Sequence, residues 1–359
     1  GFMRQKQKNN FSLRLAVVGG NLTAENLQII AKVAEKYGDG HVHLTSRQSV
    51  EIPFIKLDDV EEVKEVLATG GCKPGVCGPR VRTITACQGS AVCPSGNIDS
   101  YDIAKKLDER YFARELPHKF KFGVTGCQNN CLKAEENDVG IKGASIVEWE
   151  EAACINCGIC EKTCRVDAIS TVDGKIVLDE EKCNNCGRCV KACPTDAWKA
   201  TPAFEVSFGG LFGNRVYKGE NYLPLVTSEE QLFRITDAAI QFFDDNANPG
   251  ERFRMTLERV GLDKFEEKNS IRRLRRHTMA DFTIDETVDI TDVVCPMTFV
   301  KAKVAMEELE IGQVLSVHMN DGEPVQNVPR SFKEEGQQVL KLIDNEDGTY
   351  DLIVKKLEE

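Results

Sequence analysis

Four cysteines, placed as two short pairs far apart in the sequence, constrain this chain more than any other feature. Cys87 and Cys93 are separated by five residues, and Cys127 and Cys131 by three. Two short pairs of thiolates suit a 4Fe–4S cube, because one cysteine must reach each corner iron. The wide gap between the pairs means that a folded domain, and not a local loop, must bring them together.

Basic residues accompany both pairs. Arg82 lies five residues before Cys87, and Lys119 and Lys121 stand upstream of Cys127. Cations beside a cluster predict that a strongly anionic group binds there. Both pairs in this order, with VRTITACQG at the first and LPHKFK before the second, resemble the siroheme-dependent sulfite and nitrite reductases.

The resemblance implies the cofactor and its surroundings. In this family the four cysteines hold a 4Fe–4S cluster, and the last, here Cys131, also bridges to the siroheme iron. LTSRQSVEI is similar to the family's TxRQ segment, whose arginine faces siroheme and substrate; the matching residue is Arg47. Siroheme is a polycarboxylate, so the implied pocket cations, also the candidate catalytic groups, are Arg47, Arg82, Lys119 and Lys121. A solvated hairpin arginine is the alternative for Arg47, and Arg80 is the alternative to Arg82.

Eight further cysteines form two runs with the spacing of a bacterial two-cluster ferredoxin, C-x2-C-x2-C-x3-C. In that pattern the fourth cysteine of each run binds the other run's cluster. One predicted 4Fe–4S cluster therefore takes Cys154, Cys157, Cys160 and Cys193. The other takes Cys183, Cys186, Cys189 and Cys164. Zinc is the alternative metal for closely spaced cysteine pairs, and Arg165 stands where the pattern usually has proline.

Length and charge exclude several classes of protein. The 359 residues exceed one ordinary core, so two or more domains are expected. A net charge of −11 argues against a nucleic-acid partner, and no apolar run approaches the about 20 residues of a membrane span. Twelve of the fifteen cysteines stand at metal-ligand spacings, and no apolar signal follows the basic N-terminus, which together predict the reducing cytoplasm. Gly1 and Phe2 before Met3 look like a remnant of cloning.

We predict an α+β chain built on the siroheme reductase fold. Helices are expected over 22–38, 58–71 and 228–243, and strands over 11–18 and in a hairpin at 41–55. The expected parts are a disordered tail or cloning remnant at 1–10, a ferredoxin-like lobe at 11–70, a discontinuous siroheme/4Fe–4S lobe at 71–148 and 197–268, an inserted ferredoxin at 149–196, a linker at 269–281, and a C-terminal domain at 282–359.

The C-terminal segment predicts strand, helix, strand, helix, strand, strand, a two-layer sandwich that resembles the TusA-like sulfur carriers. In that family a cysteine before a proline starts the first helix and carries a persulfide, which matches Cys295-Pro296. A helix N-terminus lowers a thiol's pKa and so favours the thiolate. Thr298 replaces the second proline of the family's CPxP motif, and an ordinary buried cysteine is the alternative.

The resemblance implies six-electron reduction of sulfite to sulfide, with one siroheme and three 4Fe–4S clusters. Electrons are expected from a ferredoxin or similar protein, because no flavin or nicotinamide motif is visible, and then through the two ferredoxin clusters. Cys295 is expected to accept sulfur from the site or to bring sulfur to it, and a sulfur-transfer partner is also expected. Larger family members contain two related halves and this chain one, so a homo-oligomer is expected. Nitrite reduction and a non-catalytic relay are the alternatives, while Cys72 and Cys77 are expected bystanders or redox thiols.

Overall fold

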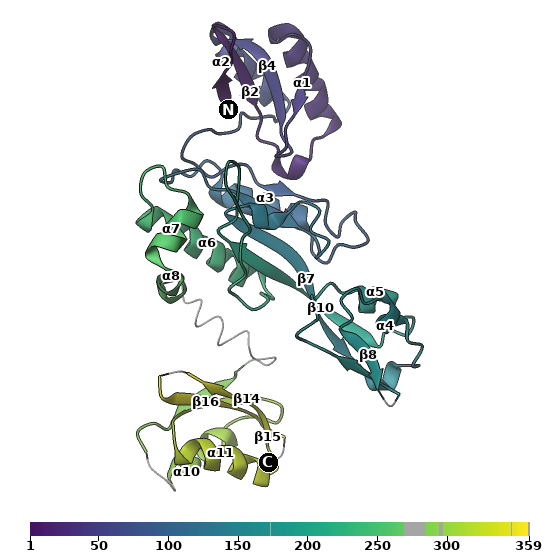
Figure 1. The fold of residues 1–359 in the computed structure, drawn as a ribbon, viewed down its shortest axis with the longest axis vertical. Helices are drawn as coiled ribbons and strands as arrows, with labels where there is room; N and C mark the ends of the chain where they lie inside the picture. The colour runs from purple at the N-terminus through teal and green to yellow at the C-terminus, as the bar shows by residue number, and fades with distance from the viewer. Residues whose placement is uncertain (173, 269–283, 294–296, 346, 358–359) are drawn as a thin grey trace. The chain divides into compact units, whose positions relative to one another are not determined.

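The structure is a computed structural model that describes residues 1–172, 174–268, 284–293, 297–345 and 347–357 (Figure 1). It divides into two compact units, Gly1–Arg275 and Arg276–Glu359, each with its own hydrophobic core. The predicted linker at 269–281 and the predicted carrier residue Cys295 lie outside the described residues. No helix in the described ranges has the length and apolar character that crossing a bilayer requires.

The N-terminal lobe is a four-stranded antiparallel sheet with two helices packed on it. Its strands, in the order β1-β2-β4-β3 across the sheet, are β1 (Phe2–Arg4), β2 (Asn10–Arg14), β3 (His43–Leu44) and β4 (Val50–Lys56). The helices are α1 (Ala24–Tyr37) and α2 (Val60–Thr69). Thr23 and Asn26 form a reciprocal capping box at the start of α1, and Gly38 ends it, so the helix predicted at 22–38 is confirmed.

Residues 1–10 correct one prediction, because the chain is not a disordered tail there. β1 pairs with β2 from Phe2↔Leu13 to Arg4↔Phe11. Phe2 also packs against the lobe's core, which contains Leu13 and Ile52. The short strand was missed because its few apolar side chains lie among lysines and asparagines, a composition typical of a loop.

The lobe that the sequence predicts to be the siroheme/4Fe–4S reductase domain (the reductase lobe) is built on a second sheet, in the order β10-β7-β6-β5. Its strands are β5 (Thr85–Ala86), β6 (Phe122–Thr125), β7 (Val139–Trp149) and β10 (Trp198–Phe208), with a β-ribbon of β11 (Leu211–Phe212) and β12 (Val216–Tyr217). Strands β5, β6 and β7 are parallel, whereas β10 runs antiparallel to β7. Its helices are α3 (Ser100–Tyr111), α6 (Glu229–Asn246), α7 (Phe253–Val260) and α8 (Leu262–Lys268).

Aromatic side chains fill the core of this lobe. Phe120 lies 5.2 Å from Phe122, 5.5 Å from Phe243 and 5.1 Å from Phe253 between ring centroids. These tilted and edge-on contacts are worth about 0.5–1.5 kcal/mol each beyond the buried area. They join LPHKFK and the first residue of β6 to α6 and α7, although these segments are far apart in the sequence. The helix predicted at 228–243 is confirmed, with Ser228 as its cap.

The two longest strands, β7 and β10, form a continuous antiparallel ladder of eleven residue pairs, from Phe208↔Val139 to Trp198↔Trp149. Beyond the tryptophan pair the chain forms a small subdomain, with α4 (Ile159–Thr163), β8 (Ile169–Val172), β9 (Lys175–Leu178) and α5 (Arg188–Ala192). Figure 1 shows these elements at the end of the ladder. Both short helices begin after a left-handed glycine, Gly158 or Gly187, as expected for two copies of one motif.

The second unit has the predicted order of strands and helices. It contains β13 (Glu286–Asp289), α10 (Met297–Glu307), β14 (Val314–Asn320), α11 (Glu323–Glu334), β15 (Gln338–Asp344) and β16 (Thr349–Lys355). The sheet order is β13-β14-β16-β15, with β13 parallel to β14 and the other neighbours antiparallel. Phe332 and Phe299 join the two helices against the sheet at a centroid distance of 5.2 Å.

Candidate active site

The first cysteine pair and the second follow two adjacent parallel strands. Cys87 comes directly after β5, and Cys127 comes two residues after β6. Because parallel neighbours end at the same edge of a sheet, the two loops meet there. The Cys87 amide continues the ladder by donating to Val124 O at 3.1 Å. A side chain on Gly126 would come within 2.8 Å of Gly89 Cα, so the close approach of the two loops requires glycine.

The environment of these thiols favours a shared group. Burial opposes ionisation of Cys87, but hydrogen bonds from Ser100 and the Gly126 amide outweigh it and lower its pKa. Burial raises the pKa of Cys127, and so do the neighbouring thiols of Cys87, Cys93 and Cys131. The Cys127 thiol is therefore affected by the three other cysteines of the two pairs.

Arg47 reaches this lobe from the turn between β3 and β4. Its guanidinium donates to Asn137 Oδ1 at 2.9 Å and to Thr83 O at 3.2 Å. Burial, and then the charges of Arg82 and Arg252, lower its pKa to about 10, although Asp138 opposes them. Arg47 is thus a partly buried cation that hydrogen-bonds to the second lobe, unlike the fully solvated hairpin arginine of the alternative.

Lys121 lies in the same electrostatic neighbourhood. Burial lowers its pKa to about 8, with further contributions from Arg47 and Arg252. Lys119 adds a smaller repulsion to Lys121 and also lowers the pKa of His118, which burial lowers most. The two lysines of LPHKFK and Arg47 therefore belong to one positively charged site.

The two arginines that the sequence could not separate differ in position. Arg80 forms an exposed ion pair with Glu115 at 2.6 Å. Arg82 instead donates to the carbonyl oxygens of Val76 and Gly78, and its charge is felt by Arg47. Arg82, and not Arg80, therefore lies beside the positively charged site that contains Arg47.

Arg252 is a member of this site that sequence reasoning missed. Its Nη2 donates to both oxygens of Asp138 at 2.8 Å, and Asp138 is fully buried. Asp138 Oδ2 also accepts from the Lys121 amide at 2.9 Å. Arg252 stands at the N-cap of α7, and no local motif marks it, because its partner Asp138 lies 114 residues away.

The charges at this site do not balance. Arg47, Lys121 and Arg252 all act on one another, and the buried carboxylate among them is Asp138. Buried like charges are costly unless anions neutralise them. Arg252 Nε is also buried without a hydrogen-bond partner among the described residues. A polycarboxylate such as siroheme fits this surplus of positive charge and the unpartnered donor.

The eight remaining cluster cysteines line two small cavities in the inserted subdomain. One cavity is lined by Cys154, Cys157, Cys160 and Cys193. The other is lined by Cys164, Cys183, Cys186 and Cys189. In each, the fourth cysteine comes from the other run, which is the predicted exchange; their ligation of iron stays a prediction. The described residues contain no three such side chains close enough to hold one metal ion, and a cube of four irons holds its ligands further apart.

The second of these cysteine sets lies against the reductase loops. Asn97 Nδ2 donates to Cys186 O at 3.2 Å, and Lys191 Nζ donates to Pro94 O and Gly96 O at 3.0 and 2.9 Å. A cavity of about 200 Å³ lies between the two sides, lined by Cys127 and Cys186 among others. The cysteines of the reductase lobe and those of the insert therefore face one another across a short gap.

The two leftover thiols occupy different environments. Cys72 is buried in the core of the N-terminal lobe, and burial raises its pKa. Cys77 is exposed, and its charge acts on Arg82. Neither lines the three cavities described above.

Three family profiles match the chain in sequence order. The "Nitrite/Sulfite reductase ferredoxin-like half domain" matches residues 3–69, and the "Nitrite and sulphite reductase 4Fe-4S domain" matches residues 77–276. "Sulfurtransferase TusA" matches residues 286–356.

Among curated proteins, the chain is 32% identical to an uncharacterised protein of Methanocaldococcus jannaschii, over 75% of this chain and 93% of that protein. It is also 32% identical to one of the subunits of the anaerobic sulfite reductase of Salmonella typhimurium, over 62% of this chain and 72% of the relative. Coenzyme F420-dependent sulfite reductase of Methanocaldococcus jannaschii matches at 32% identity, over 70% of this chain and 40% of the relative.

Two solved structures share the fold. Dissimilatory sulfite reductase I superposes with a TM-score of 0.61 at 20% identity, over 77% of this chain and 72% of that chain. The NirA protein of Mycobacterium tuberculosis superposes with a TM-score of 0.52 at 17% identity, over 74% of this chain and 40% of that chain.

Proposed function

Because the chain belongs to the nitrite and sulphite reductase 4Fe-4S family, we propose that it is a siroheme-dependent sulfite reductase that converts sulfite to sulfide with six electrons. The observation that carries the proposal is the surplus of partly buried positive charge formed by Arg47, Lys121 and Arg252 around Asp138. It belongs to the lobe in which four cysteines interact. A polycarboxylate cofactor and an anionic substrate would both relieve this repulsion.

The side chains have distinct roles in this proposal. Cys87, Cys93, Cys127 and Cys131 would hold the cluster, with Cys131 shared with siroheme, which when bound supplies the redox-active iron of the reaction. Arg47 and Arg82 each present a planar fork that can bind two oxygens of one anion. Lys119 and Lys121 offer ammonium groups, and a pKa of about 8 makes Lys121 suited to release a proton near neutral pH.

The contacts of the insert support an order for the electron relay. The set Cys164, Cys183, Cys186 and Cys189 adjoins the reductase loops through Asn97 and Lys191. The set that contains Cys154 and Cys157 would then face the protein donor, a ferredoxin or similar. Cys157 is exposed, and Ile155 beside it is 63% exposed, which suits contact with a partner.

The C-terminal unit extends the proposal to sulfur transfer. Its match to a sulfurtransferase family supports a persulfide carrier at Cys295, which would take its outer sulfur from the persulfide of a partner by thiol–persulfide exchange and hand it on to a further thiol. We also propose self-association, since the larger relatives contain two related halves, and the cytoplasm, where cysteines destined for iron stay reduced.

Nitrite is the second candidate substrate, because nitrite reductases of Emericella nidulans and Escherichia coli are also relatives, each 32% identical over 39% of this chain. Turnover by the reduced protein with sulfite and with nitrite, compared as kcat/KM, separates the two.

The proposal is tested by the visible spectrum and iron content of anaerobically purified, reconstituted protein. Siroheme absorption above the broad iron–sulfur shoulder, iron for three clusters, and sulfide production from sulfite are expected. If siroheme absorption is absent while the iron content still matches three clusters, the reductase proposal fails and only electron transfer and sulfur relay remain.

A further inference from the structure

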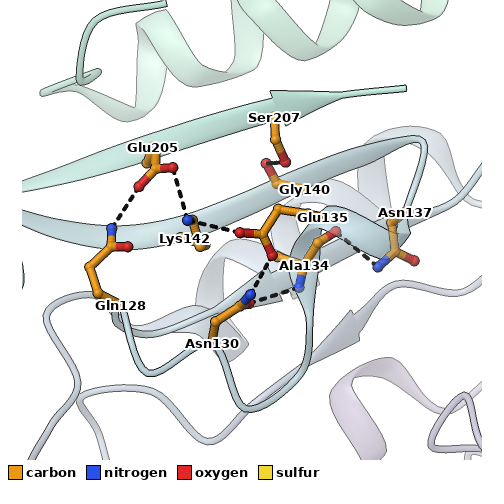
Figure 2. A network of polar contacts seen from close by, with 9 residues as sticks. All are labelled: Gln128, Asn130, Ala134, Glu135, Asn137, Gly140, Lys142, Glu205 and Ser207. Carbon is orange, nitrogen blue, oxygen red and sulfur yellow. Dashed lines mark hydrogen bonds and ion pairs between the residues drawn. The ribbon is translucent and has the colours of Figure 1, made fainter. Parts of the chain in front are cut away.

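A buried lysine links the two longest strands of the reductase lobe to the loop that carries Cys127 and Cys131. Lys142 of β7 lies 2.8 Å from Glu205 Oε1 and 2.9 Å from Glu135 Oε1 (Figure 2). Glu205 is its direct cross-strand partner on β10, whereas Glu135 lies in the turn before β7. The exposed fractions of the three side chains are 12%, 22% and 10% for Lys142, Glu205 and Glu135.

The second oxygen of each glutamate binds the loop between the two cysteines. Gln128, directly after Cys127, donates to Glu205 Oε2 at 2.8 Å. Asn130, directly before Cys131, donates to Glu135 Oε2, and its own Oδ1 accepts from the Ala134 amide at 2.9 Å. Figure 2 shows both amides pointing toward the glutamates on either side of Lys142.

The turn that carries Glu135 is itself held from two directions. The Gly219 amide donates to Glu135 O at 2.8 Å. Gly140 lies against it so closely that a side chain there would come within 2.4 Å of Ala134 O. The position of Glu135 is therefore fixed by its own turn, and the loop that binds Glu135 is held in place by it.

The charges of this group are coupled. Burial alone would lower the pKa of Lys142, but the hydrogen bonds that it donates to Glu205 and Glu135 outweigh burial and raise the pKa. Burial would likewise raise the pKa of Glu135, but Lys142 holds it low. Lys142 and Glu135 are thus held in their charged forms, and removing the lysine would leave the carboxyl groups of Glu135 and Glu205 facing one another in a poorly hydrated place.

We propose that Lys142, Glu135 and Glu205 form a clamp that positions the Cys127–Cys131 loop, and with it the sulfur shared between the cluster and the siroheme iron. Only one part of this inference rests on the proposed function, namely that the Cys131 sulfur is shared with siroheme. The three are positioning residues, because they act through Gln128 and Asn130 and not on the substrate.

Two variants test the clamp in the reconstituted holoenzyme. Lys142→Met removes the central cation, and Gln128→Met removes one loop contact while leaving the three charges in place. Loss of a group that holds a metal ligand typically weakens metal binding about 10- to 100-fold. Both variants are therefore expected to lose iron to a chelator about tenfold faster, and to show less magnetic coupling between cluster and siroheme in Mössbauer spectra.

Lys106→Met is the matched control, because Lys106 also bridges two carboxylates, Asp102 at 2.6 Å and Glu229 at 2.7 Å, but on the exposed surface. It should match the wild type in both measurements, and Lys142→Arg should recover most of the coupling. If Lys142→Met fails to fold by circular dichroism, Gln128→Met decides.

Wild-type iron loss and wild-type coupling in Gln128→Met would overturn the clamp. Failure of the proposed function would be seen earlier and separately, as absent siroheme absorption in the unmodified protein. The chelator measurement would still test the clamp in that case.

Discussion

At the scale of single residues, the site is defined by charge that has not been neutralised. Lys121, Arg47 and Arg252 share a buried neighbourhood with Asp138. A folded protein rarely retains such repulsion unless a ligand compensates it. The apoprotein should therefore be less stable than the loaded protein, and the difference should depend on pH.

Lys121 makes that dependence measurable. Its pKa is 10.5 in an unperturbed chain and about 8 in the fold. Between these values the folded apoprotein has released a proton that the unfolded chain still holds, so stability rises with pH across this window. Lys121→Met should abolish the rise and stabilise the apoprotein below pH 8 by about 1–2 kcal/mol, after solvent screening is allowed for.

Urea unfolding of the apoprotein at several pH values between 7 and 10.5 checks this expectation, with exposed Lys106→Met as the control. In the holoenzyme the same Lys121→Met change should lower kcat at least about 100-fold, as expected for loss of a proton donor. A variant that unfolds with the wild-type pH profile would contradict the buried position of the lysine.

Cys295 carries a prediction that is independent of the reductase site. Cys295→Ala should leave sulfite reduction unchanged and abolish persulfide labelling of the chain, because a single thiol is proposed to carry the sulfur. Labelling by a thiol-specific persulfide reagent, followed by mass spectrometry, measures it. Equal labelling of the variant, with the label elsewhere, would remove the carrier from the proposal.

The residues that could be predicted are those that belong to short sequence motifs. The cluster cysteines and LPHKFK were recognised because each motif fits within a few residues, and the family resemblance they carried is confirmed. Arg252 could not be found this way, since its partner Asp138 lies 114 residues away. The clamp glutamates likewise meet Lys142 only through strand pairing and the turn before β7.

At the scale of elements, the ends of β5 and β6 position the cysteine loops. The loops approach so closely that a side chain on Gly126 would lie 2.8 Å from Gly89 Cα and 3.5 Å from Cys87 Sγ. Backbone cannot move aside as a flexible side chain can, so the two strand ends must shift to admit even a methyl group.

Gly126→Ala should therefore destabilise the reductase lobe by about 1–3 kcal/mol and reduce the iron retained per chain. Gly213→Ala is the control, because a Cβ there would meet nothing within 4 Å. Thermal unfolding and iron analysis of both variants measure the effect. Equal iron and equal stability in the two would mean that the loops are not in contact.

Element prediction succeeded where local signals agreed. α1 lies within the predicted range 22–38 and is capped by Thr23, and α6 follows Ser228, the first residue of the predicted range 228–243. α2 lies within the predicted range 58–71, and the side chain of its N-cap residue, Asp59, makes no capping hydrogen bond. The strand β1 was missed because a three-residue strand is stabilised by its neighbour β2 and not by its own sequence.

At the scale of the whole molecule, the chain consists of two units with separate cores. The predicted α+β class is confirmed, and the composition changes near residue 281 marked the second unit. The unit Gly1–Arg275 contains every cluster cysteine and every pocket cation named above.

A fragment of residues 1–275 should consequently fold and bind the same cofactors as the full chain. Its visible spectrum and its iron content per chain should be unchanged, because no core residue of the reductase lobe comes from the second unit within the described residues. Sulfite reduction should also persist, and only persulfide labelling should be lost. A fragment without iron would show that the second unit is needed for folding.

In the proposed electron relay, strand β7 would set the distances between the cofactor sites. Lys142 fixes the reductase cluster loop, Val147 lines the second cysteine cavity, and Trp149 pairs with Trp198, which lines the first. Successive residues advance about 3.4 Å along a strand, so the number of ladder residues between these positions would set the spacing of the proposed cofactors. An insertion that lengthened this ladder would increase the distances over which electrons pass in the proposed relay, even with every metal ligand unchanged.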